Sequence, residues 1–113
     1  MDKERFQGLV EEAVAGIPRK FKKYLKNVAV IVEDRPPRGS RLLGLYHGVP
    51  LQYRGPYYGN IPPDVIVIYQ MPIEEICRSD DEVRDKVEEV VLHEIGHYFG
   101  LDEKTLRRIE SKR

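Results

Sequence analysis

The segment from Ser79 to Gly100 constrains the fold of this chain more than any other, because its pattern fits one long helix. Ser79 is followed three residues later by Glu82, which is the spacing of a capping box at a helix start. Apolar residues then recur every three or four positions, and Gly100 supplies the left-handed position at which helices end. The sequence therefore predicts a core-facing helix from about Asp80 to about Phe99.

The remaining residues predict shorter elements around this helix. The apolar run at residues 64–70 favours a central strand, and the β-branched run at residues 28–33 a second strand. We expect an α+β fold, in which a small mixed or antiparallel sheet of three to four strands packs against N-terminal helices and the long C-terminal helix. The predicted helices are at about 2–17, 18–26, 72–77 and 103–111, and the predicted strands at 28–33, 41–48, 50–54 and 64–70, the middle two of these as a hairpin.

Composition excludes several classes of protein. The 113 residues suit a single domain over residues 1–113, and 19 basic side chains balance 19 acidic ones, so no nucleic-acid partner is expected. The single cysteine excludes an internal disulfide and fits a reducing compartment. No signal peptide and no apolar run of about 20 residues is present, so we expect a cytoplasmic protein that does not enter membranes.

The chemistry of the chain concentrates near the end of the long helix, in the motif HEIGH. His93 and His97 are four residues apart, so both imidazoles lie on one helix face and can reach the same metal ion. Glu94 is rotated by about 100° from His93 and can flank that ion without binding it. Two histidines and one further protein ligand are typical of a catalytic Zn²⁺ site. Glu94 is then the candidate catalytic base.

Two acids after the motif compete for the third ligand position. Residues 93–100 match HExxHxxG, and Glu103 stands where the metzincin pattern has its third histidine. Gly100 allows the chain to leave the helix and turn back toward the metal. Asp102 suits the N-cap of the last predicted helix, a role that would engage its carboxylate. We therefore favour Glu103 as the third ligand and keep Asp102 as the alternative.

Five other residues could contribute to the site but also have simpler structural explanations. His47 is best explained as a turn residue, and Cys77 as a buried small side chain. Tyr57 and Tyr58 could steady an oxyanion with a phenol, but surface or core packing is the better explanation for both. Gly96 costs roughly 1 kcal/mol of helix stability relative to alanine. It is either a tolerated small residue or a point where the helix packs closely on a strand or leaves room for substrate.

The order of these segments resembles that of the small bacterial zincin-like metallopeptidases, sometimes called minimal metalloproteases. The resemblance is carried by NVAVIVED, LLGLYHGVPL, IPPDVIVIYQMPIEE and VVLHEIGHYFGLDEKTL, which follow one another in the family's order. It implies a zincin-like fold in which His93 and His97 bind zinc, Glu94 is the catalytic base and an acid three residues after Gly100 completes the site. That acid is Glu103 here, whereas relatives carry aspartate.

Three functions are compatible with this pattern. The first is a zinc-dependent peptidase that binds a peptide or protein substrate extended along an edge strand. The second is a deformylase-like amidase, which is weaker because the residues around Cys77 do not resemble the cysteine motif of such enzymes. The third is a zinc-stabilised regulatory or binding domain without catalysis. Glu94 argues against the third, since a purely structural zinc site needs no base.

Overall fold

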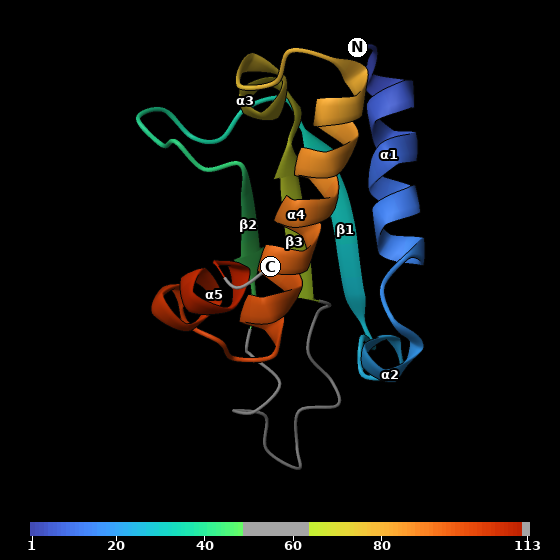
Figure 1. The fold of residues 1–113 in the computed structure, drawn as a ribbon, viewed down its shortest axis with the longest axis vertical. Helices are drawn as coiled ribbons and strands as arrows, with labels where there is room; N and C mark the ends of the chain where they lie inside the picture. The colour runs from blue at the N-terminus through green and yellow to red at the C-terminus, as the bar shows by residue number, and fades with distance from the viewer. Residues whose placement is uncertain (49–63, 112–113) are drawn as a thin grey trace.

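The computed structural model of the protein describes residues 1–48 and 64–111, which form five helices and three strands. Helices α1 and α4 pack side by side, and α4 also lies against β2 and β3 (Figure 1). This arrangement confirms the predicted α+β fold with a small mixed sheet. In chain order the elements are α1 (Lys3–Ala15), α2 (Arg19–Lys22), β1 (Val28–Glu33), β2 (Gly44–His47), β3 (Asp64–Tyr69), α3 (Gln70–Glu75), α4 (Asp80–Tyr98) and α5 (Glu103–Glu110).

The sheet has the strand order β1-β3-β2, so the apolar strand β3 is central, as its composition predicts. β1 pairs with β3 in parallel, with Val28 opposite Asp64, whereas β2 pairs with β3 in antiparallel fashion, with Gly44 opposite Ile68. Among the described residues 1–48 and 64–111, β2 is therefore an edge strand of the sheet. Its position matters for the site because α4 runs directly beneath it.

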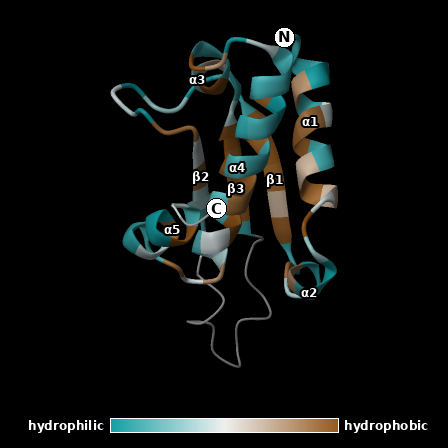
Figure 2. Ribbon diagram, viewed as in Figure 1, coloured by the Kyte–Doolittle hydropathy of each residue, from teal (hydrophilic) through white to brown (hydrophobic). Residues whose placement is uncertain are grey.

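The core lies between the sheet and the two long helices. Hydrophobic residues make much of β1 and β3 brown in Figure 2. Alternate residues of a strand point to opposite faces, and in β3 Ile66 and Ile68 are fully buried on the helix side. Helix α4 contributes the apolar face that its spacing predicts. The residues buried in this core are Phe6, Leu9, Val10, Ile17, Ile66, Ile68, Ile73, Val83, Val87, Val90, Val91 and Ile95.

Helix α4 ends in a Schellman motif, which reverses the chain. The N–H of Leu101 donates to the carbonyl of Gly96 at 3.0 Å, and the N–H of Gly100 donates to the carbonyl of His97 at 2.9 Å. Gly100 has a φ of 88°, which is the left-handed conformation expected at this position. The turn sends α5 back across the last turns of α4.

Two glycines set the distances at which other elements approach α4. A Cβ at Gly44 would lie 2.7 Å from Cγ1 of Val90, so the edge strand β2 can rest on α4 only without a side chain there. A Cβ at Gly96 would lie 2.4 Å from Cδ2 of Leu106. Gly96 is therefore a close-packing position as considered above, but its neighbour is α5 and not a strand or a substrate.

Most predicted boundaries are confirmed, including β1 at residues 28–33 and the Ser79 cap, whose Oγ accepts from the Glu82 N–H at 3.2 Å. The second helix is shorter than predicted, because none of its residues is buried and Asn27 then adopts a φ of 60° to lead into β1. The third helix begins at residue 70, two residues earlier than predicted, and the strand at 41–48 is limited to 44–47. The predicted strand at 50–54 lies outside the described residues.

Within the described parts of the chain, no helix is both long enough and apolar enough to cross a membrane.

Candidate metal centre

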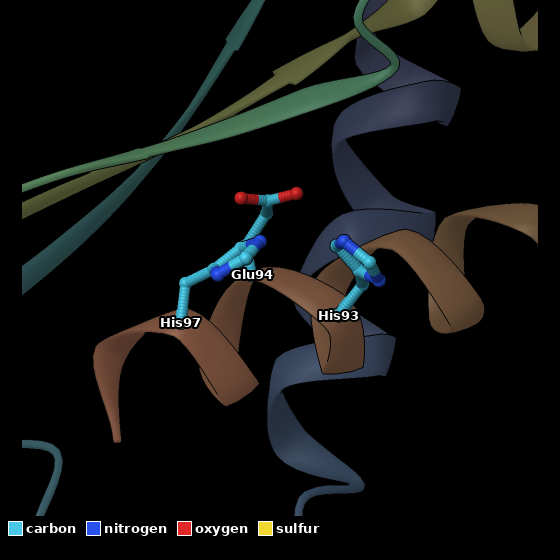
Figure 3. Close-up of side chains that lie close together, drawn as sticks. All are labelled: His93, Glu94 and His97. Carbon is cyan, nitrogen blue, oxygen red and sulfur yellow. The ribbon is translucent and has the colours of Figure 1, made fainter. Parts of the chain in front are cut away.

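The motif residues form a compact His–Glu–His cluster, His93, Glu94 and His97, near the C-terminal end of α4 (Figure 3). One potential ligand atom from each residue lies within 4.8 Å of the other two. The two imidazole rings have centroids 5.0 Å apart and stand nearly perpendicular to each other. The helical spacing therefore brings the two histidines together as the sequence predicts.

Glu103 reaches both histidines from the first residue of α5. Its Oε1 lies 3.0 Å from Nε2 of His93 and 2.8 Å from Nε2 of His97. The hydrogen bond with His93 lowers the pKa of Glu103, and although burial opposes this effect, the contact with His97 adds to it. One carboxylate oxygen thus faces the two ring nitrogens that would hold a metal ion.

The carboxylate of Asp102, unlike that of Glu103, caps a helix. Its Oδ1 accepts the backbone N–H of Thr105 at 2.8 Å, which makes it the N-cap of α5, as predicted. This backbone hydrogen bond lowers the pKa of Asp102. The geometry therefore favours Glu103 for the third ligand position, and the ligand assignment stays a prediction.

Glu94 differs from Glu103 in its surroundings, although both acids lie beside the histidines. Glu94 is buried, with 6% of its surface exposed, whereas the Glu103 side chain is 56% exposed. Burial raises the pKa of Glu94, although the charges of His97 and His93 and the backbone N–H of Tyr46 in β2 oppose the rise. Glu94 is thus held beneath the edge strand, and the more accessible carboxylate of Glu103 is the one that bridges the two Nε2 atoms.

The Nδ1 atoms of the histidines are also engaged. Nδ1 of His97 lies 2.9 Å from the carbonyl oxygen of Leu101, and Nδ1 of His93 lies 2.8 Å from Oε2 of Glu110. The sequence interpretation did not identify Glu110. Its only signal is the spacing of seven residues from Glu103, which places both acids on the same face of α5.

A cleft of about 750 Å³ opens over the cluster. Its walls come from β2, the second half of α4 and helix α5, and it includes Gly44, Tyr46 and all three residues of the His–Glu–His cluster. The buried carboxylate of Glu94 and the paired histidines therefore face a space large enough for a bound ligand.

Comparison with known proteins places this geometry in context. The family model described as zincin-like metallopeptidase matches residues 25–113, which is most of the chain and includes the whole cluster. The chain belongs to this family. A solved structure of a conserved hypothetical protein from T. thermophilus is similar to it, with 26% sequence identity, a TM-score of 0.59 and coverage of 99% of this chain and 100% of that one. No curated protein gives a significant match.

Membership of this family implies a metal ion, and the side chains present fit one. The two Nε2 atoms point at a common carboxylate oxygen, while both Nδ1 atoms face outer acceptors. Two imidazole nitrogens and one carboxylate oxygen form a donor set that suits Zn²⁺ and leaves a coordination position open. The His–Glu–His cluster with Glu103 is therefore a candidate metal site.

The other candidates from the sequence lie elsewhere. His47 is the last residue of β2 and is exposed, so it belongs to a strand and not to the predicted turn. Cys77 is only partly buried, and burial raises the pKa of its thiol. Tyr57 and Tyr58 lie outside the described residues.

The metal-free protein should lose stability as pH rises above the ordinary pKa of histidine. Burial by itself lowers the pKa of His93, but its hydrogen bonds with Glu110 and Glu103 prevail and raise the pKa above 6.5. A group with a raised folded pKa contributes stability that is complete below its unfolded pKa and is lost as pH rises through its folded pKa. Zinc must displace a proton from His93 in order to bind, so zinc affinity should increase as pH rises.

Chemical denaturation with chelator present, between about pH 5 and about pH 9, measures this loss. His93→Gln is the control, because the raised pKa of Glu94 also disfavours the folded state as pH rises. The pH dependence should be steeper for the wild type than for His93→Gln. Equal slopes for the two proteins would contradict the prediction.

Proposed function

We propose that this protein is a zinc-dependent peptidase that hydrolyses peptide bonds with Glu94 as general base. The observation that carries the proposal is a buried carboxylate with a raised pKa, Glu94, which lies beside two paired histidines and lines the same cleft under strand β2. A purely structural metal site has no need of such a group or of such an opening.

Strand β2 provides the surface on which a peptide could be held. The N–H of Tyr69 donates to the carbonyl of Leu43 at 3.0 Å, and hydrogen-bonded pairs recur at every second residue of an antiparallel ladder. The backbone groups of Gly44, which is out of phase with that ladder, therefore point to the outer edge of the sheet. An extended substrate can pair with this edge by main-chain hydrogen bonds.

Glu94 lies where a base is needed. A bound Zn²⁺ would polarise the scissile carbonyl and lower the pKa of water. As the water oxygen attacks the carbonyl carbon, Glu94 accepts a proton, which it then delivers to the amine nitrogen when the C–N bond breaks. The raised pKa suits this double role, since the group must accept a proton in one step and release it in the next. The Tyr46 N–H holds the carboxylate in place.

Metal removal and reloading test the proposal directly. The protein is stripped with chelator, dialysed, and incubated with an unstructured protein substrate with and without added Zn²⁺, and cleavage products are identified by mass spectrometry. We expect cleavage only after zinc is restored. If zinc raises the melting temperature but neither form cleaves the substrate, the non-catalytic binding domain becomes the better explanation.

A further inference from the structure

Glu110 lies outside the HExxHxxG motif, yet it contacts one of the two motif histidines. It is the last residue of α5 and follows His93 by 17 residues. Its Oε2 lies 2.8 Å from Nδ1 of His93, and the two side chains are 31% and 21% exposed. This pair is therefore a tertiary contact in a partly buried setting and not a local pair along one helix.

The position of Glu110 follows from the way α5 docks. Glu103, Leu106 and Glu110 are spaced by three and four residues, so they share one helix face. Leu106 is the buried residue of this helix, and its side chain packs in the space left by the missing side chain of Gly96. Docking of Leu106 brings Glu103 to one nitrogen of His93 and Glu110 to the other.

The chemistry of imidazole gives the Glu110 contact a consequence for metal binding. A neutral histidine carries one N–H, and a carboxylate can only accept a hydrogen bond. Without metal, both ring nitrogens of His93 face carboxylates, which favours a proton on each nitrogen. If a metal ion replaces the proton on Nε2, the Glu110 contact keeps the other proton on Nδ1, so that the Nε2 lone pair is the one that binds the metal. The backbone carbonyl of Leu101 has the same effect on His97. A charged acceptor additionally makes the imidazole a stronger ligand.

We infer that Glu110 is a positioning residue of the metal site, which fixes the tautomer and orientation of His93 and strengthens its bond to the metal. This inference rests on the proposed zinc site but not on catalysis. Glu110 is not itself placed as a ligand, because it meets His93 on the Nδ1 side, whereas Nε2 of both histidines faces Oε1 of Glu103. One short helix thus supplies both the third ligand position and the outer acceptor.

Zinc affinity, measured by competition with a chromophoric chelator, tests the inference without any substrate. Loss of an outer-shell partner typically weakens metal binding by about 10-fold to 100-fold, and we expect a loss in this range for Glu110→Ala. Glu110→Gln should lose less, because its amide oxygen still accepts a hydrogen bond. Glu89→Ala is the matched control, since it removes a carboxylate of the same cleft that pairs with Lys86 at 3.1 Å.

A second measurement separates positioning from a general structural role. Nitrogen NMR of the zinc-loaded protein reports which nitrogen of His93 carries the proton, and the wild type should show a protonated Nδ1. Equal zinc affinity for Glu110→Ala and Glu89→Ala, or an unprotonated Nδ1 in the wild type, would overturn the inference. A wild type that binds zinc with the expected Glu110 dependence but cleaves no peptide would support the inference while removing the proposed function. A wild type that binds no zinc would remove both.

Discussion

Glu94→Gln should reduce peptidase activity by about 10²-fold to 10⁴-fold, the range by which a positioned general base accelerates proton transfer. Zinc affinity should be almost unchanged, because Glu94 lies beside the two histidines without bridging their Nε2 atoms, which Glu103 does. Glutamine has nearly the shape of glutamate, and its amide oxygen can still accept from the Tyr46 N–H. The loss should therefore appear in the turnover number and not in metal content.

The same substitution should leave the metal-free protein as stable as the wild type, or more stable. Burial raises the pKa of Glu94, which means that the folded state disfavours its ionised form. For an acid with a raised pKa, this penalty is absent at low pH and develops as pH rises from its unfolded pKa through its folded pKa. A neutral glutamine removes the penalty at neutral pH. Loss of activity together with unchanged or increased stability is typical of a catalytic residue that has been retained at a cost.

Activity, zinc affinity and denaturant midpoint are measured together for Glu94→Gln and for Glu88→Gln. Glu88 is an exposed acid on the same helix and controls for the loss of one negative charge. Substantial peptidase activity in Glu94→Gln would exclude the proposed role of this residue. A fall in zinc affinity would indicate that Glu94 is a ligand and that the roles of the two acids must be exchanged.

Local signals in the sequence were sufficient for the helix that carries the site. The Ser79 cap and the Gly100 turn depend on contacts within a few residues, and the apolar face of α4 follows from helical spacing. The structure confirms all three. The pairing of His93 with His97 also follows from helical spacing alone. The fold class could be predicted because the order of helices and strands leaves few ways to cover a small sheet.

The tertiary contacts around the site could not be predicted from these local sequence signals. The approach of Glu110 to His93 and the packing of Gly96 against Leu106 both depend on how α5 docks on α4. That geometry is fixed by a turn and one buried side chain, which the sequence does not place in space. The hydrogen bond from the Tyr46 N–H to Glu94 similarly requires that β2 be the edge strand above α4. The sequence therefore left open the third ligand and the contacts of Glu110 and Tyr46 that hold His93 and Glu94.

The choice between Glu103 and Asp102 as third ligand should be decided by substitutions with opposite effects. Glu103→Ala should weaken zinc binding by more than the roughly 10-fold to 100-fold typical of an outer-shell loss, since it removes the oxygen that faces both Nε2 atoms. Peptidase activity should fall with zinc occupancy. Glu103→Asp tests whether a shorter side chain at the first residue of α5 can still reach the Nε2 atoms of the two histidines.

Asp102→Ala should instead lower the melting temperature while leaving zinc affinity nearly unchanged. It removes the side chain that caps α5 through the Thr105 N–H, and alanine is a poor N-cap. Because a frayed α5 would also displace Glu103, Asp102→Asn separates the two causes: asparagine caps as well as aspartate but lacks its charge. If Asp102→Asn loses zinc while Glu103→Ala keeps it, Asp102 is the ligand. Retention of zinc by Asp102→Asn and its loss in Glu103→Ala would place Glu103 on the metal and assign Asp102 to the cap.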